Sequence, residues 1–164
     1  MTVVVVMGVS GSGKTTVGSA LAERLGVEYA EADTFHSQAN IGKMTAGHAL
    51  TDADRAPWLE SIARWIRRHQ ETGGVVTSSA LKRRYRDVLR TGGDVWFLHL
   101  DGDRSVLAER MKTRTGHFMP VSLLDSQLAD LEPLQPDEPG RVFDITERPE
   151  AIVAATLAGF REHA

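Results

Sequence analysis

Eight consecutive residues near the start of the chain have the types and spacing of a phosphate-binding loop. The stretch Gly8-Val9-Ser10-Gly11-Ser12-Gly13-Lys14-Thr15 fits the pattern G-x-x-x-x-G-K-[ST]. Its glycines let backbone N–H groups turn toward phosphate oxygens, and the start of a following helix adds a positive dipole end. Lys14 can reach the β- and γ-phosphates of a nucleotide, and the Thr15 hydroxyl can bind Mg²⁺. Thr16 is expected to be a helix residue beside the nucleotide.

The flanking residues supply the strand and the helix that such a loop requires. Residues 3–7 form an apolar, β-branched run, which predicts a short buried strand at the centre of a parallel sheet. After the loop, apolar residues recur at helical spacing as far as Leu25, and Gly26 provides a stop. The order strand, loop, helix is the context in which the pattern binds phosphate.

A carboxylate is predicted at the same rim of the sheet. Residues 27–32 read as a second strand that ends at Asp33. Ligands in open parallel sheets lie beyond the carboxyl ends of the strands. Asp33 is therefore expected to orient an acceptor hydroxyl, take its proton and lie near a metal held by Thr15. Capping the turn after the strand is the alternative role.

The rest of the chain alternates strands and helices. Further strands are predicted at 75–78, 95–100 and 141–145. The pattern predicts a single α/β domain over residues 1–164, a three-layer P-loop kinase fold with a five-stranded parallel sheet. Residues 37–70 are expected to form a helical substrate-binding region. Residues 112–122, where basic residues stand beside Gly and Pro, are expected to form a mobile lid.

Composition limits the class of protein. The formal net charge of −3 gives no electrostatic case for binding nucleic acid. The absence of cysteine excludes disulfides, thiolate metal sites and cysteine nucleophiles. The N-terminal apolar run is too short for a signal peptide or a membrane span. We expect a cytoplasmic enzyme with no membrane partner, because ATP is abundant in the cytosol.

Two classes of nucleotide-binding protein compete, a small-molecule kinase and a GTPase-like switch module. A switch needs a guanine-reading N-K-x-D element, which we do not find. Asp101 superficially resembles a metal aspartate. Its strand is expected to lie away from the catalytic side of the loop, so we interpret Asp101 as a strand-end residue. A kinase needs cations around the transferring phosphoryl group, and Arg110 and Arg114, four residues apart, are the candidates.

Several blocks in chain order resemble the bacterial gluconokinases of the small P-loop type. Besides the phosphate loop they are Asp33-Thr34-Phe35-His36, Asn40-Ile41-Gly42-Lys43-Met44, residues 50–59, 79–87, 116–118 and 126–132. The resemblance implies a fold similar to shikimate and adenylate kinases. It also implies conversion of ATP and D-gluconate to ADP and 6-phosphogluconate, with Mg²⁺, usually by a homodimer.

The residue types agree with a polyhydroxy acid as the acceptor. Arg55 and Arg86 are the candidates for its carboxylate, because Arg offers a planar fork. Arg55 stands out because a cation is disfavoured in the first turn of a helix. Arg86 has the alternative of a surface salt bridge. His36 is expected to bind a sugar hydroxyl, with packing in a loop as its alternative.

Other residues are expected to complete the two binding sites. Those assigned to the acceptor are Ser79, the backbone of Ala80 and Leu81, His117 and Gln127. The loop 146–149 is expected to hold adenine, with Arg110 stacked on the base. Shikimate kinase is the alternative activity. It would be expected to have a Gly-rich turn where this chain has Ser79-Ala80-Leu81.

Overall fold

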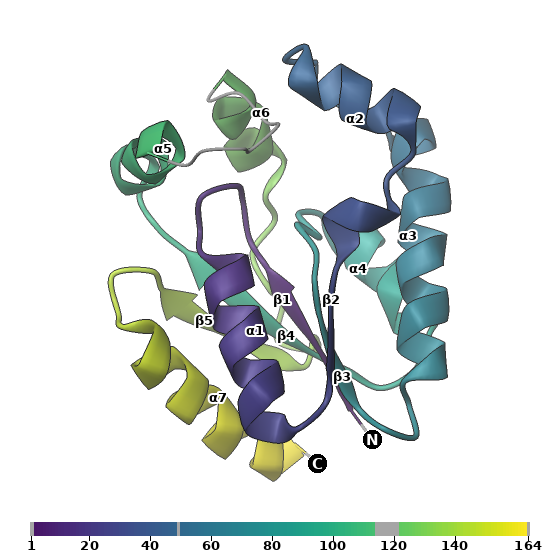
Figure 1. Ribbon diagram of the computed structural model, residues 1–164, viewed down its shortest axis with the longest axis vertical. Helices are drawn as coiled ribbons and strands as arrows, with labels where there is room; N and C mark the ends of the chain where they lie inside the picture. Colours follow the sequence, from purple (N-terminus) through teal and green to yellow (C-terminus); the bar gives the residue numbers. More distant parts are fainter. Residues whose placement is uncertain (1, 49, 114–121, 164) are drawn as a thin grey trace.

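A computed structural model of the protein describes residues 2–48, 50–113 and 122–163. Figure 1 shows a central sheet with helices on both faces. The strands are β1 (Val3–Met7), β2 (Glu28–Glu31), β3 (Gly74–Thr77), β4 (Val95–Asp101) and β5 (Gly140–Asp144). The helices are α1 (Lys14–Leu25), the 3₁₀ helix η1 (Ala32–Phe35), α2 (Gln38–Thr45), α3 (Asp52–Arg68), α4 (Arg83–Arg90), α5 (Arg104–Thr113), α6 (Ser122–Asp130) and α7 (Pro149–His163). The predicted α/β class and the five strands are confirmed.

The sheet order is β2-β3-β1-β4-β5, and every neighbouring pair is parallel. All five residues of β1 are fully buried, which explains the unbroken apolar run in the sequence. Val4 and Val6 pack in a core with residues of α1, α5 and α7, whereas Val3, Val5 and Met7 pack on the other face against α3 and α4. The phosphate loop therefore follows a fully buried strand at the centre of the sheet.

One local expectation, the end of the second strand, is wrong. Strand β2 ends at Glu31, and Asp33 lies in η1 rather than at the end of the strand. Strand β4 pairs directly with β1, so it does adjoin the strand that carries the phosphate loop. It lies on the flank away from β2. Asp101 is exposed there, opposite Asp144 in the sheet register.

Helix α3 begins with a capping box. The Thr51 side chain accepts from the Asp54 N–H, and the Asp54 carboxylate accepts from the Thr51 N–H. Trp58 and Trp65 are buried against the sheet. The capping box fixes the first turn of α3, which carries Arg55.

Within the described residues, none of the helices has the length and apolar character that crossing a bilayer requires.

Candidate active site

The loop between β1 and α1 has the backbone of an anion cradle. Gly8, Gly11 and Gly13 have φ angles of 150°, 83° and 93°, which favour glycine. A Cβ on Gly8 would lie only 2.7 Å from the carbonyl oxygen of Leu100, so a side chain does not fit there. Helix α1 begins at Lys14 with no side-chain cap from Gly13. Its first N–H groups therefore face the loop, where an anion can accept from them.

The two functional side chains at the end of this loop already have protein partners. The Lys14 ammonium donates to the carbonyl oxygens of Gly8 at 2.9 Å and Val9 at 3.1 Å. The Thr15 hydroxyl donates to Glu31 Oε1 at 2.8 Å. The ammonium is thus held over the loop, and the hydroxyl points toward the end of β2.

Glu31 is a site residue that the sequence analysis missed. Its carboxylate accepts from Thr15 and, at 3.0 Å, from the Tyr29 hydroxyl. Burial and the neighbouring Glu31 charge together raise the pKa of Tyr29 to about 12, so the hydroxyl stays protonated. Glu31 stands two residues before Asp33. Glu31 and Asp33 flank a single residue at the predicted end of the strand, and this pair of acidic residues could have identified Glu31 from the sequence.

Oxygen donors suited to Mg²⁺ line one cavity with Lys14. They are Thr15, Glu31 and Asp33. The described residues contain no cluster of three or more His, Cys, Asp and Glu side chains that could hold a metal alone. Mg²⁺ usually takes one or two protein oxygens together with phosphates and water. This donor set fits that requirement.

A second cavity extends from the phosphate loop toward β5 and α7. It is lined by Gly11, Ser12, Gly13, Thr15, Thr16, Val17, Arg110, Ile145, Glu147, Pro149 and Ile152. The Arg110 guanidinium donates from Nη2 to the carbonyl oxygen of Ile145 at 2.9 Å. The predicted nucleotide residues Thr16 and Arg110 and the predicted adenine loop thus lie around one cavity. Its apolar residues suit the flat face of a base.

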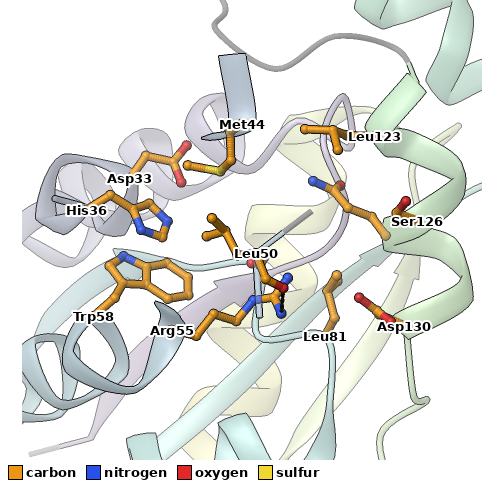
Figure 2. A pocket seen from close by; sticks show the side chains of 12 residues that line it. Asp33, His36, Met44, Leu50, Arg55, Trp58, Leu81, Leu123, Ser126 and Asp130 are labelled. Atoms are coloured by element: carbon orange, nitrogen blue, oxygen red, sulfur yellow. Dashed lines mark hydrogen bonds between the residues drawn. The ribbon is translucent and has the colours of Figure 1, made fainter. Parts of the chain in front are cut away.

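A third cavity lies between η1, α2, α3 and α6 (Figure 2). It is lined by Asp33, His36, Met44, Leu50, Arg55, Trp58, Ser79, Leu81, Leu123, Ser126, Gln127 and Asp130. We call it the acceptor pocket. In Figure 2, Asp33 and His36 stand on one side of it, and Ser126 and Asp130 stand on the other. Met44, Leu50, Arg55 and Trp58 come from the predicted substrate-binding region.

Asp33 connects the acceptor pocket to the phosphate loop. It lines both the acceptor pocket and the cavity that contains Lys14 and Thr15. Ser79 and Gln127 also line both cavities. The half-buried Asp33 carboxylate is therefore accessible from both sides. An acceptor hydroxyl can lie beside it and still face a terminal phosphate.

Arg55 offers a hydrogen-bonding edge to the acceptor pocket. Its Nη1 donates to the carbonyl oxygen of Leu50 at 2.8 Å and to the Tyr85 hydroxyl at 3.0 Å. Within the described residues, Nε and Nη2 have no hydrogen-bond partner. These two nitrogens form the side-on fork that matches a carboxylate. Arg55 thus lines the pocket with two donors that a carboxylate could accept from, and its role stays a prediction.

His36 is packed and neutral. Its ring stacks on Trp58 with 4.2 Å between the ring centroids, and the Trp58 indole donates to the Ala32 carbonyl oxygen at 2.7 Å. Burial lowers the pKa of His36 to about 4, although the nearby Asp33 charge opposes the shift. The neutral ring offers one donor and one acceptor. His36 is both a packed residue and a member of the pocket lining.

Arg86 does not lie where the sequence analysis expected it. Its side chain is fully buried and bonds to the Glu138 carboxylate through Nε at 2.5 Å and Nη2 at 3.0 Å. It also donates to the carbonyl oxygens of Ala80, Leu81 and Pro133. These contacts use all five donors of the guanidinium, so none is left for a substrate. The prediction of direct substrate contact is wrong for Arg86.

The loop after β3 carries the remaining predicted substrate residues. Ser79 and Leu81 line the acceptor pocket, whereas Ala80 is fully buried with a φ of 42°. Arg86 holds the carbonyl groups of Ala80 and Leu81 from behind. The ion pair with Glu138 thus supports the wall of the pocket without reaching into it.

Gln127 joins α6 to the phosphate loop. Its Oε1 accepts from the Ser10 N–H at 2.7 Å, and its Nε2 donates to the Ser10 hydroxyl at 3.1 Å. The sequence predicts a substrate contact for Gln127, and the structure adds this contact with the loop. Arg114, His117 and most of the predicted lid at 112–122 lie outside the described residues.

The comparisons with known proteins agree with one another. The family profile described as "Shikimate kinase" matches residues 10–139. The chain is 48% identical to the gluconokinase of Gluconobacter oxydans, over 96% of this chain and 90% of that protein. Its structure is similar to a sugar kinase from Janibacter (TM-score 0.93, 52% identity, 98% of this chain and 95% of the other). It is also similar to a gluconokinase from Sinorhizobium meliloti (TM-score 0.89, 47% identity, 99% and 93%). The chain therefore belongs to the gluconokinases, within the wider family that the shikimate kinase profile describes.

Proposed function

We propose that this protein transfers the γ-phosphoryl group of ATP to the 6-hydroxyl of D-gluconate, giving 6-phosphogluconate and ADP. The observation that carries the proposal is the position of Asp33, which lines both the acceptor pocket and the cavity of Lys14. Identities of 39–49% to gluconokinases of several organisms support the choice of acceptor.

In this mechanism Asp33 accepts the proton of the 6-hydroxyl as its oxygen attacks the γ-phosphorus. The new O–P bond forms while the bond from the γ-phosphorus to the bridging oxygen breaks, and ADP leaves with that oxygen. Lys14 and Arg110 stabilise the charge that spreads over the transferring oxygens. The backbone of residues 8–13 and the side chains of Ser10, Ser12, Thr15 and Thr16 hold the phosphates.

Mg²⁺ would be held by the Thr15 hydroxyl together with Asp33 and Glu31, through water where the carboxylates do not reach it. When bound, the ion neutralises negative charge on the phosphates. Glu31 accepts a hydrogen bond from the Thr15 hydroxyl, which leaves an oxygen lone pair for the metal.

The acceptor is held along the pocket by groups suited to a polyhydroxy acid. Arg55 takes the carboxylate at its Nε and Nη2 edge. His36, Ser79 and Gln127 bind hydroxyls, and Leu81 packs against the carbon chain. From the sequence alone we also assign His117, in the predicted lid, to this site, and Arg114 to the transferring phosphoryl group beside Arg110. The family resemblance supports a cytoplasmic homodimer, which size-exclusion chromatography with light scattering would test.

A coupled ADP-release assay tests the proposal. Gluconate, shikimate, glucose and AMP are offered in turn with ATP and Mg²⁺, and turnover is expected with gluconate. Turnover with shikimate or AMP alone would overturn the assignment. The variants Lys14→Ala and Asp33→Ala should lose activity while remaining folded. Full activity in both would show that the catalytic site lies elsewhere.

A further inference from the structure

A tyrosine outside the acceptor pocket lies directly behind Arg55. Tyr85 belongs to α4 and is almost fully buried, and the Arg55 guanidinium carbon lies 5.1 Å from the centre of its ring. We propose that Tyr85, held by Asp52, is a positioning residue that directs the free edge of Arg55 at the carboxylate of the sugar acid. This inference rests on the proposed function.

The hydrogen bonds define a chain with one direction. Arg55 Nη1 donates to the Tyr85 oxygen at 3.0 Å, and the Tyr85 hydroxyl donates to Asp52 Oδ1 at 2.5 Å. A guanidinium has donors and no acceptor, so the single phenolic proton must point to Asp52. The Asp52 carboxylate thereby orients the Tyr85 oxygen, and its lone pair faces Arg55.

The hydrogen bonds of this chain determine which nitrogens of Arg55 remain available to a ligand. The Leu50 carbonyl and the Tyr85 oxygen use both protons of Nη1. A planar group held twice at one end cannot turn about the Cδ–Nε bond without losing a hydrogen bond. Its Nε and Nη2 are therefore kept toward the pocket as a preorganised fork. Without the Tyr85 oxygen, Nη1 keeps only the Leu50 contact, and other orientations become accessible.

Asp52, at the far end of this hydrogen-bond chain, lies at the surface. The Asp52 side chain is 54% exposed and also pairs with Arg84. The hydrogen bond from Tyr85 lowers the pKa of Asp52, so the carboxylate remains an acceptor at neutral pH. Asp87, on α4, provides a matched control. It is also 54% exposed and pairs with an arginine of the same helix, Arg83 at 2.9 Å. Among the described residues, its carboxylate forms no hydrogen bond or ion pair with Tyr85 or Arg55.

The test is a comparison of Tyr85→Phe with the parent enzyme, because phenylalanine keeps the ring and removes the hydroxyl. We expect KM for gluconate to rise about tenfold, the factor that 1.4 kcal/mol represents. KM for ATP should change less than about twofold. Asp52→Ala should raise KM for gluconate in the same direction, and Asp87→Ala should leave it unchanged. Equal increases in the two KM values of Tyr85→Phe would refute the inference.

A double-mutant cycle separates the inference from the function on which it rests. If Tyr85 acts through Arg55, Tyr85→Phe should have no further effect on KM for gluconate once Arg55→Ala is present. Arg55→Lys serves the same purpose should Arg55→Ala not fold. If Tyr85→Phe raises KM for gluconate by the same factor with and without the Arg55 substitution, the action of Tyr85 through Arg55 is refuted, but the proposed function is not. An unchanged KM for gluconate in the Arg55 variants would instead refute the assignment of the carboxylate to Arg55.

Discussion

Replacing Arg86 by methionine should destabilise the fold far more than it weakens substrate binding. Arg86 and the Glu138 side chain are both fully buried, and the guanidinium spends all five donors on protein oxygens. Methionine fills most of the volume but leaves the buried Glu138 carboxylate with only the longer ion pair to Arg83, whose Nη1 lies 3.6 Å from Oε1. Breaking a buried ion pair in this way costs about 3–5 kcal/mol.

That loss is large enough to measure by thermal unfolding. For a chain of this size each kcal/mol of lost unfolding free energy lowers the midpoint temperature of unfolding by about 2–4 °C. Arg86→Met should therefore lower that temperature by roughly 6–20 °C. The double variant Arg86→Met/Glu138→Leu should recover part of the loss, because no lone charge remains inside. Circular dichroism would follow unfolding in the parent, both single variants and the double variant.

Activity at a temperature where all variants are folded completes the test. Arg86→Met should change KM for gluconate less than Arg55→Ala does, whereas Arg55→Ala should change the unfolding midpoint less. The opposite pattern, an unchanged midpoint with a large rise in KM, would show that the Arg86 guanidinium meets the substrate. It would refute the argument from its five internal hydrogen bonds.

Three further changes test other parts of the site. Asp33→Asn should lower kcat by about 10²–10⁴-fold with a smaller change in KM for gluconate, because the base acts in the transition state; comparable effects on both constants would contradict that role. Glu31→Gln should raise the Mg²⁺ concentration needed for half-maximal activity by roughly tenfold or more, and an unchanged Mg²⁺ titration would exclude Glu31 from the metal site. Stability should fall as pH drops from 6.5 toward 4, because the unfolded chain takes up a proton at His36 while the folded protein, in which the pKa of His36 is about 4, does not. Urea midpoints at pH 7 and pH 5 should therefore differ less in His36→Gln than in the parent, and equal differences would refute the linkage.

Features encoded by neighbouring residues could be predicted from the sequence. Strand β1 is an unbroken apolar run because both faces of the sheet are covered. The capping box of Thr51 and Asp54 and the start of α7 at Pro149 are also readable from the sequence, since each depends on residues within one helical turn. The phosphate loop belongs to the same class. The backbone conformation of the loop follows from the spacing of its own glycines.

Features that depend on distant partners were missed or misassigned. Glu31 acquires its role from Thr15, sixteen residues earlier, and Tyr85 from Arg55, thirty residues earlier. The sequence predicts a substrate contact for Arg86 because it does not distinguish an arginine that binds a carboxylate of a ligand from one that binds a carboxylate of the protein. Its partner, Glu138, lies fifty-two residues away, in a loop without periodicity.

The phosphate loop and the acceptor pocket are linked through α6 as well as through the sheet. Gln127 lines the acceptor pocket, yet its amide holds both the N–H and the hydroxyl of Ser10. A phosphate oxygen that accepts from the Ser10 N–H must compete with Gln127 Oε1, just as it must draw Lys14 from the carbonyl oxygens of Gly8 and Val9. Because each exchange replaces one hydrogen bond by another, it costs little. We therefore expect nucleotide binding to weaken the contact between Gln127 and Ser10, which would let the Gln127 amide bind a hydroxyl of the acceptor.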